Sequence, residues 1–254
     1  MSLSEAEKKE LTKKLVYGGF NYHQGTSAHQ FQLFEANKYD TTFSEIHREL
    51  GIPYLKRGIA HTFYPHFQKV IQYDVLNWQG WRGYNYLFFY RDYERALQDF
   101  IEMDNLTPGV VDHPQALNID YLKAICYLKM GDHQNALQFF NKQIKYEMES
   151  VGVEYMEPVS FLYRGIAYWE IGEFAKAKRS FEMALENDRK NADAAFWLAK
   201  YWLQAGNQKK AKEMIAIAKD FSIKGYDLRR PYVEAFYQTY LADIEEFATE
   251  LGKL

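Results

Sequence analysis

A repeating pattern of small residues constrains the fold of this chain more than any other feature of its sequence. Four segments share an alanine followed four residues later by a large apolar residue. They read Ala96…Phe100, Ala136…Phe140, Ala177…Phe181 and Ala211…Ile215. The alanines are spaced 40, 41 and 34 residues apart. Such periods are typical of repeat proteins, in which each unit is one supersecondary element that buries its apolar face against its neighbours.

A short turn precedes each of these segments. The turns read Arg91-Asp92, Gly131-Asp132, Gly172-Glu173 and Gly206-Asn207. Glycine is favoured at the left-handed position that follows a helix, because it has no Cβ to clash. Asp or Asn can then accept a hydrogen bond from the free N–H groups that open the next helix, whereas Glu caps less well. Each unit is therefore predicted to be a helix, a tight turn and a second helix.

The third unit shows the apolar spacing of both helices. Its large apolar residues are Phe161, Ile166, Tyr168 and Trp169 on the first helix, and Ala177, Phe181, Ala184 and Leu185 follow on the second. The second set recurs at i, i+4, i+7 and i+8, which is one face of a helix. We expect Gly165 to face Ala177 where the helix axes approach closely, with Phe181 filling the space towards the next unit.

This pattern resembles the tetratricopeptide repeat family. The family signature has an aromatic residue, Leu-Gly and a second aromatic on the first helix, then Ala, an aromatic and Ala on the second. The matching residues are Leu87, Ala96 and Phe100; Ala124, Tyr127, Ala136 and Phe140; Phe161, Gly165, Tyr168, Ala177, Phe181 and Ala184; and Leu198, Ala199, Trp202, Ala211, Ile215 and Ala218. The chain departs from the signature at Lys123 and Arg164, where the family has Leu. The resemblance implies an all-α array of helical hairpins, a right-handed α-solenoid.

The array is expected to occupy the middle of the chain. Its four hairpins are predicted at about 77–116, 117–157, 158–191 and 192–225, so the array covers 77–225. A capping helix is predicted at 231–251, opened by Pro231 at a compatible first position and followed by apolar residues at helical spacing. A helix without a partner is the expected form of a terminal cap.

Residues 1–76 are expected to form an irregular helical region with a degenerate repeat. Pro53 and Pro65 interrupt its apolar pattern, so the degenerate pair is predicted at 54–63 and 65–73. With the array and the cap, this region is expected to make one continuous structural unit.

The composition favours a soluble, cytoplasmic protein that binds neither membranes nor nucleic acids. No stretch approaches the roughly 20 apolar residues of a membrane span, and the charged N-terminus lacks the apolar core of a signal peptide. Lys plus Arg (31) nearly balance Asp plus Glu (34), unlike the basic surface of a duplex-binding domain. A groove for single-stranded nucleic acid would also need cations that the chain does not supply.

No motif in the sequence predicts catalysis, a metal or a cofactor. The seven histidines include no HExxH, and the single cysteine, Cys126, excludes a Cys-cluster zinc site and an internal disulfide. We therefore expect a non-enzymatic protein without cofactors. The alternative is an enzyme or a small-ligand-binding protein with a site among His47, His61, His66 and Tyr64, which a pocket with perturbed pKa values would favour.

The resemblance implies that the first helices line a concave groove for a partner. Carried over by position, the groove residues are Trp78, Trp81, Asn85, Phe88, Asn118, Tyr121, Ile125, Leu162, Ile166, Trp169, Phe196 and Lys200, with Leu128, Val159, Asp193 and Leu203 along the same surface. This surface is aromatic and aliphatic, which suits an apolar peptide or helix of another protein.

Two further expectations concern this groove. The family's cationic clamp for acidic chaperone tails falls here on Trp81, Asn85, Leu122, Val159 and Tyr163. Only Asn85 agrees, so that ligand is not expected, because its carboxylates would be buried without partners. The groove is either open to a partner or filled by the chain's own N-terminal or C-terminal region, since aromatic residues are enriched in both settings.

Overall fold

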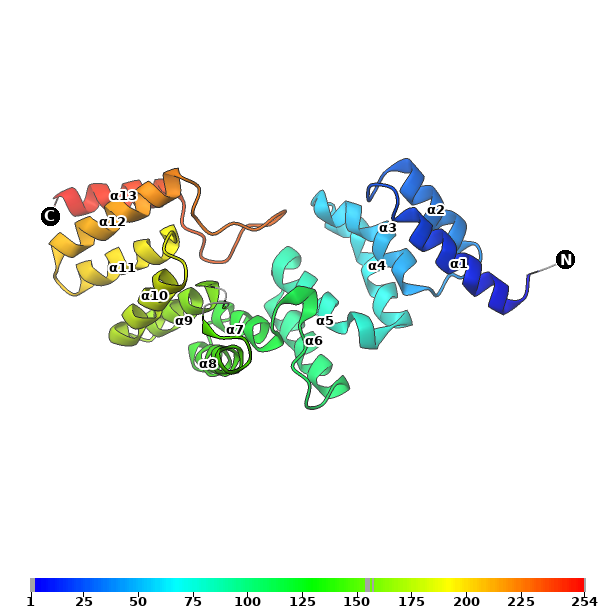
Figure 1. The fold of residues 1–254 in the computed structure, drawn as a ribbon, viewed down its shortest axis with the longest axis horizontal. Coiled ribbons are helices and arrows are strands. Elements are labelled where there is room, and N and C mark those ends of the chain that lie inside the picture. The colour runs from blue at the N-terminus through cyan, green and yellow to red at the C-terminus, as the bar shows by residue number, and fades with distance from the viewer. Residues whose placement is uncertain (1–2, 154–155, 157, 254) are drawn as a thin grey trace. The chain divides into compact units, whose positions relative to one another are not determined.

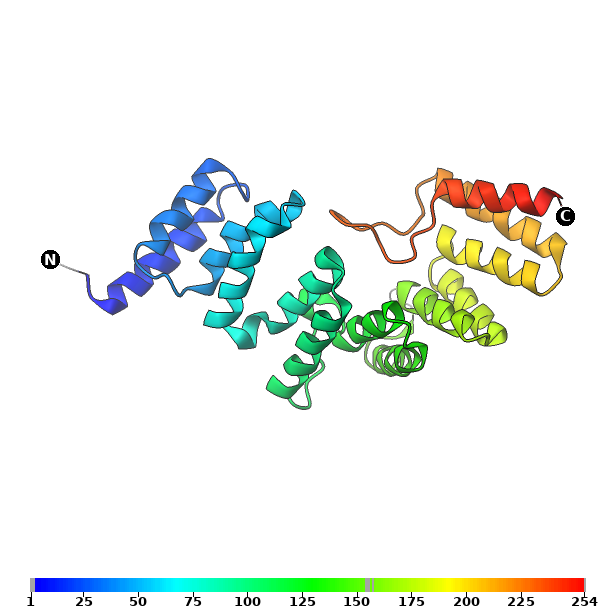
Figure 2. The same cartoon turned by 180° about the vertical axis from the view of Figure 1, so that it is seen from behind.

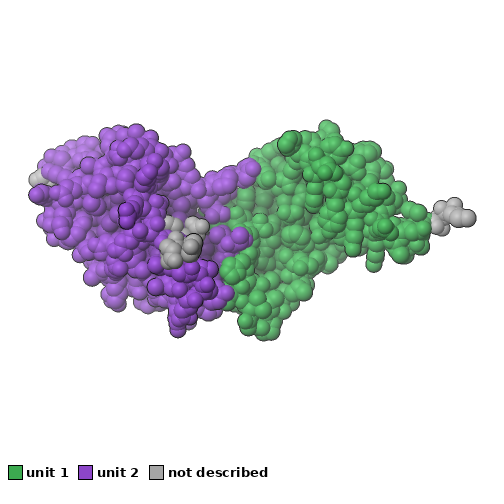
Figure 3. All heavy atoms as spheres, in the orientation of Figure 1, with its two compact units in different colours: residues 1–115 green, residues 116–254 purple. Residues whose placement is uncertain are grey.

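A computed structural model describes residues 3–153, 156 and 158–253 of the chain. These residues form helices joined by turns and loops, with no β-strand among them. They group into two compact units, Met1–Gln115 (unit 1) and Ala116–Leu254 (unit 2), which Figure 3 colours separately. None of the described helices has the length and apolar character needed to cross a membrane.

The described part of unit 1 consists of three helical pairs (Figure 1). They are α1 (Glu5–Gly19) with α2 (Ser27–Asn37), α3 (Ser44–Lys56) with α4 (Ala60–Tyr73), and α5 (Val75–Asn85) with α6 (Tyr93–Leu106). A π-helical turn, η1 (Tyr86–Tyr90), extends α5 before the chain reaches α6.

Unit 2 continues the same pattern, seen from the other side in Figure 2. Its pairs are α7 (Ile119–Lys129) with α8 (His133–Ser150), α9 (Pro158–Glu170) with α10 (Phe174–Asn187), and α11 (Ala192–Gln204) with α12 (Gln208–Ile223). A single helix, α13 (Leu241–Lys253), packs against α12, and a short 3-10 turn, η2 (Pro114–Ala116), joins the two units. The all-α helical-hairpin repeat fold is thus confirmed.

The turns within the pairs have the predicted chemistry. Gly131, Gly172 and Gly206 have φ values of 81°, 77° and 74°, so all three adopt the left-handed conformation. Arg91 takes the same conformation with φ 55°, although it carries a Cβ. The side chains of Asp92, Asp132 and Asn207 cap α6, α8 and α12 by accepting a main-chain N–H, whereas Glu173 makes no such bond.

Small residues bring the helices of each pair together. A Cβ added at Gly165 would lie 2.4 Å from the ring of Phe181, and one added at Gly83 would lie 2.7 Å from the ring of Phe100. The four repeat alanines Ala96, Ala136, Ala177 and Ala211 are fully buried. The axes of the paired helices therefore approach as closely as the small residues allow.

The N-terminal region differs from the sequence prediction. Residues 44–73 form two helices whose break falls at 57–59, and both Pro53 and Pro65 lie inside helices rather than between them. Proline removes one main-chain hydrogen bond from a helix interior. The buried side chains Phe63, Phe67 and Val70 lie on both sides of Pro65, so packing outweighs that loss. The expected irregular region is therefore two regular helical pairs.

The last helix also differs from the prediction. It begins at Leu241, ten residues after the expected start at Pro231, and residues 226–240 are not helical. Tyr232 and Tyr237 have φ values of 69° and 52°, which no α-helix accommodates. Contacts with α9 and α11, described below, hold this stretch in its non-helical conformation.

Helix α13 covers the apolar end of the last pair. Its Ile244 and Leu251 are buried in one cluster with Ala211, Ile215 and Ala218 of α12. The boundary expected at 157/158 falls beside residues 154–155 and 157, which lie outside the described residues. The continuity of the two units stays a prediction of the sequence.

Candidate functional site

Residues 226–240, the 226–240 loop, join α12 to α13 and contact the first helices of unit 2. In Figure 1 the loop leaves the end of α12, runs outward and returns to the start of α13. Its residues Ala235, Phe236 and Thr239 are buried. Three groups on the first helices account for its position, and they come from α7, α9 and α11.

Asp193, in the first turn of α11, holds both arms of the loop. Its Oδ2 accepts the main-chain N–H of Leu228 at 2.7 Å, and its Oδ1 accepts that of Thr239 at 2.8 Å. The side chain is buried, with 1% exposure. Burial raises the pKa of Asp193, and the two N–H donors partly oppose that shift. The N-terminal end of α11 also favours a negative charge at this position.

Tyr163, on α9, binds the returning arm. Its hydroxyl donates a hydrogen bond to the main-chain oxygen of Phe236 at 2.8 Å. Its ring stacks on Tyr121 of α7 at 6.4 Å between centroids, and Tyr237 of the loop lies against it at 6.1 Å. Lys129, at the end of α7, places its Nζ 4.5 Å from the centroid of Tyr237. The loop thus adds its own aromatic ring to a row of rings on the first-helix face.

A cleft of about 380 Å³ opens beside the outgoing arm of the loop. Its apolar lining comes from Val159, Leu162 and Leu228. Its polar rim consists of Asp188, Lys190, Asn191, Tyr226, Asp227 and Arg229. The cleft therefore combines two positions of the predicted groove with the loop that the sequence did not predict.

The predicted groove residues divide between the two units. Trp78, Trp81, Asn85 and Phe88 belong to unit 1, and the other eight belong to unit 2. Eight of the twelve are buried: Trp81, Asn85, Phe88, Asn118, Tyr121, Ile125, Leu162 and Ile166. Four are half-buried: Trp78, Trp169, Phe196 and Lys200. The half-buried members on unit 2 are Trp169, Phe196 and Lys200.

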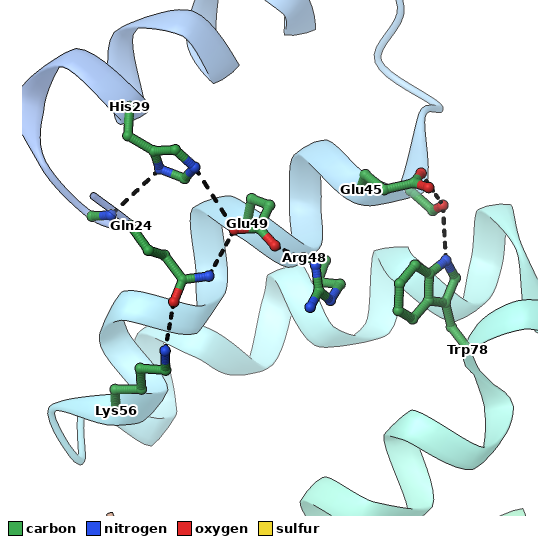
Figure 4. Close-up of polar contacts among 9 residues, drawn as sticks. Gln24, His29, Glu45, Arg48, Glu49, Lys56 and Trp78 are labelled. Atoms are coloured by element: carbon green, nitrogen blue, oxygen red, sulfur yellow. Dashed lines mark hydrogen bonds and ion pairs between the residues drawn. The ribbon is translucent and has the colours of Figure 1, made fainter. Parts of the chain in front are cut away.

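Within unit 1 the expected groove tryptophans pack against neighbouring helices. Trp78 donates its Nε1–H to Ser44 at 3.0 Å and lies beneath the guanidinium of Arg48 (Figure 4). Trp81 is only 6% exposed and lies within 6 Å of the ring centroids of Phe63 and Phe67. Both rings therefore serve the packing of α5 against α3 and α4.

Sequence reasoning placed Asp193 on the groove but missed its partners. The loop residues that bind to it are 35 and 46 positions away, so no local pattern could have indicated them. A weak signal exists: Asp193 is an acid on a helix that is otherwise apolar in its first two turns. Of the two alternatives for the groove, these contacts support occupation by the chain itself, through a loop rather than a folded-back helix.

The N-terminal region contains a polar network around a buried carboxylate (Figure 4), separate from the predicted site among His47, His61, His66 and Tyr64. Glu49, on α3, is 4% exposed and accepts a hydrogen bond from Gln24 at 2.7 Å. It also pairs with Arg48, and its Oε2 lies 3.7 Å from Nε2 of His29. Lys56 donates to Gln24 at 2.7 Å. This network ties the α1–α2 connection to α3, which is a structural role.

The surroundings of His29 favour its neutral form. Its Nδ1 accepts the main-chain N–H of Gly25 at 3.3 Å, which leaves the ring proton on the Nε2 that faces Glu49. Burial lowers the pKa of His29, and the nearby Glu49 opposes that shift. The ring is thus held by two neighbours rather than presented to a substrate.

The structure brings together only part of the predicted histidine group. The rings of His47 and His66 lie 6.1 Å apart, and His47 Nε2 is 2.8 Å from the main-chain oxygen of Thr41. His61 is exposed, and Tyr64 packs against Phe67. No three His, Cys, Asp or Glu side chains in the described ranges lie close enough together to hold a metal ion.

The buried His47 and the half-buried His66 predict an acid-sensitive fold. Burial lowers the pKa of His47 and His66 below 6.5, so the unfolded chain takes up their protons first as the pH falls. Each histidine then lowers the stability between pH 6.5 and its folded pKa, by at most about 1.4 kcal/mol per pH unit. The urea midpoint should fall between pH 7 and pH 5, and His47→Gln should reduce that slope. If the urea midpoints of the original chain and of His47→Gln depend equally on pH, His47 does not cause the acid sensitivity.

Comparison with known proteins supports the repeat fold. Residues 163–214, which span most of α9 to α12, match the sequence model of the tetratricopeptide repeat. No curated protein matches the chain. The matched stretch contains the third and fourth alanines of the sequence pattern together with Asp193.

Several solved structures share the fold at low sequence identity. PilF of Pseudomonas aeruginosa is 15% identical with a TM-score of 0.64, covering 86% of this chain and 96% of that one. PilW, a widely conserved type IV pilus biogenesis factor, is 14% identical with a TM-score of 0.65, covering 83% and 93%. YrrB, a TPR protein with an unusual peptide-binding site, is 15% identical with a TM-score of 0.57, covering 87% and 98%. At these identities the likeness concerns the fold alone.

Proposed function

We propose that this tetratricopeptide-repeat protein is a non-enzymatic interaction protein that binds a partner's polypeptide segment on the first-helix face of unit 2. The tetratricopeptide fold is typical of protein–protein interaction scaffolds, which are generally not enzymes. One observation carries the proposal. A non-helical stretch of polypeptide, the 226–240 loop, already lies on this face and is held there through its main chain by Asp193 and Tyr163.

Half-buried residues of α9 and α11, the helices that also hold the loop, support an apolar partner segment. Lys200 Nζ lies 3.9 Å from the ring centroid of Trp197 and 5.8 Å from those of Trp169 and Phe196. Aromatic rings offer large apolar area with little rotamer entropy to lose, which makes them binding anchors. The other predicted groove residues of unit 2, Asn118, Tyr121, Ile125, Leu162 and Ile166, are buried.

The proposal is tested by site-specific photo-crosslinking from two positions. A photoreactive amino acid replaces Lys190, an exposed residue on the rim of the cleft, in the full chain. We expect it to give a discrete adduct with one protein in extracts of the source cells. Adding an excess of the same chain without the photoreactive group should reduce the adduct at least tenfold.

A matched position controls for chance encounters. Lys212 is an equally exposed lysine on α12, outside the cleft. The same photoreactive group there should not give the adduct. If the two positions give identical adducts, or if the excess chain does not compete, the first-helix face is not the binding surface.

A further inference from the structure

We propose that the 226–240 loop is an internal occupant of the first-helix face, which a non-helical, aromatic-bearing segment of a partner protein displaces. The inference rests on the proposed function and specifies its ligand and its regulation. In the unbound protein the loop uses the groups that would bind the partner. The partner must therefore reproduce the loop's own contacts.

The contacts between the loop and the face are of a kind that another segment can replace. Side chains of the face make three hydrogen bonds to the loop's main chain: the N–H groups of Leu228 and Thr239 bind Asp193, and the carbonyl of Phe236 binds Tyr163. Main-chain hydrogen bonds supply affinity without reading sequence. Any segment that presents two N–H groups and one carbonyl in this arrangement can form them.

The buried carboxylate selects for polypeptide. Asp193 is 1% exposed and accepts hydrogen bonds from both arms of the loop. A carboxylate left buried without donors is strongly destabilising, so a segment that replaces the loop and buries Asp193 again must supply new N–H donors. A polypeptide supplies such donors along its backbone. A nucleic-acid phosphate brings a second negative charge and is therefore disfavoured.

One contact favours an aromatic side chain at a particular position of the bound segment. Tyr237 lies against the ring of Tyr163 and beneath the ammonium of Lys129, at 6.1 Å and 4.5 Å. A cation over an aromatic face is attracted by the ring quadrupole, which an aliphatic side chain lacks. A partner segment with an aromatic residue at this position should therefore bind more tightly than one without.

The backbone of the loop stores strain that its release would remove. Tyr232 and Tyr237 adopt φ values of 69° and 52°, in the left-handed region that side chains with a Cβ disfavour. Such conformations persist only where surrounding contacts impose them. Release of the loop therefore relieves strain that offsets part of the lost binding.

The loop can leave the face without unfolding the helices at its two ends. It begins after Gly225, whose φ of 80° and open surroundings leave it free to turn. Beyond the loop, α13 is anchored on α12 through Ile244 and Leu251, which belong to a cluster that contains no loop residue. The anchors at the two ends are thus independent of the contacts with Asp193 and Tyr163.

The test uses the loop's own sequence as the probe. A fluorescent synthetic peptide of residues 226–240 is titrated against the full chain and against a variant in which residues 227–239 are replaced by a Gly/Ser segment of equal length. We expect the variant to bind the peptide at least tenfold more tightly by anisotropy. A scrambled peptide should not bind, and Tyr237→Ala in the peptide should weaken binding severalfold.

Groove substitutions complete the design. In the loop-replaced chain, Asp193→Asn and Tyr163→Phe should each weaken peptide binding at least tenfold, while Lys212→Ala on the exposed surface of α12 should not. If a folded, loop-replaced chain does not bind the peptide, the face does not hold a polypeptide and the proposed function falls with the inference. If both chains bind the peptide equally, the face is a binding site but the loop does not occlude it, and only the inference falls.

Hydrogen exchange tests the inference without any substitution. In the unaltered chain the amides of Leu228 and Thr239 should exchange much faster than the amides in the middle of α11 and α12, because the loop opens locally. Exchange of these two amides as slow as that of the helix cores would overturn the inference, even if the loop-replaced variant does not fold.

Discussion

Replacing Trp81 by alanine should lower the free energy of unfolding by about 3–5 kcal/mol, the range for truncating a large buried aromatic. Trp81 is 6% exposed. Its ring lies 5.9 Å from Phe63, 5.6 Å from Phe67 and 5.8 Å from Trp78. Alanine would leave a cavity among three rings that are themselves confined, so the site cannot collapse to fill it. Urea unfolding followed by circular dichroism measures the loss.

A conservative substitution distinguishes packing from recognition. Trp81→Phe keeps an aromatic ring in part of the same space and should cost clearly less than Trp81→Ala, because it leaves a smaller cavity. If Trp81→Ala instead leaves the urea midpoint unchanged and weakens binding of a partner, the ring belongs to an open groove, as the sequence pattern suggested. Packing predicts a lower urea midpoint for Trp81→Ala, whereas recognition predicts an unchanged midpoint and weaker partner binding.

The turns and the close helix contacts could be predicted from the sequence because their causes are local. A left-handed glycine followed by Asp or Asn produces the same helix ending and helix start wherever it occurs. Gly131-Asp132 and Gly206-Asn207 show this in the structure. Even Arg91, which lacks the advantage of glycine, occupies the same conformation because the helices on either side require it.

The N-terminal pairs could not be predicted because packing overrides a local rule there. Proline in a helix interior costs about 3 kcal/mol, which argues for a break at Pro53 and at Pro65. Phe63 and Phe67 are fully buried on either side of Pro65, and together they recover more than one lost hydrogen bond. The sequence contains the apolar pattern of both helices, but the local rule for proline predicts breaks that the packing of the surrounding apolar residues prevents.

The loop could not be predicted because apolar residues at helical spacing can be buried in two ways. They can lie on one face of a helix, or they can be buried by contacts of a non-helical loop with distant helices. Phe236, Tyr237 and Tyr240 recur at helical intervals ahead of α13. In the structure Phe236 is buried through contacts of the loop with a helix far away in sequence, not through a helix of its own. Asp193 and Tyr163, which create those contacts, lie 46 and 73 positions from the residues that they bind in the returning arm.

Gly165→Ala is expected to destabilise unit 2 by about 1–3 kcal/mol, although alanine is the better helix former. A Cβ at this position would lie 2.4 Å and 2.5 Å from two carbon atoms of the Phe181 ring. That ring is fully buried and stacks on Trp197 at 5.6 Å, so it cannot move aside without disturbing a second ring. Overpacking typically costs about 1–3 kcal/mol and occasionally more, against about 1 kcal/mol gained from helix propensity.

Two further variants test whether the contact with Phe181 causes the loss of stability in Gly165→Ala. Gly252→Ala on α13 places a Cβ where no atom lies within 4 Å, so stability should stay the same or rise slightly. Phe181→Leu combined with Gly165→Ala should cost less than the sum of the two single changes, because the smaller side chain makes room for the added methyl group. Strict additivity, or a Gly165→Ala protein as stable as the original, would mean that α9 and α10 do not approach as closely as the structure shows.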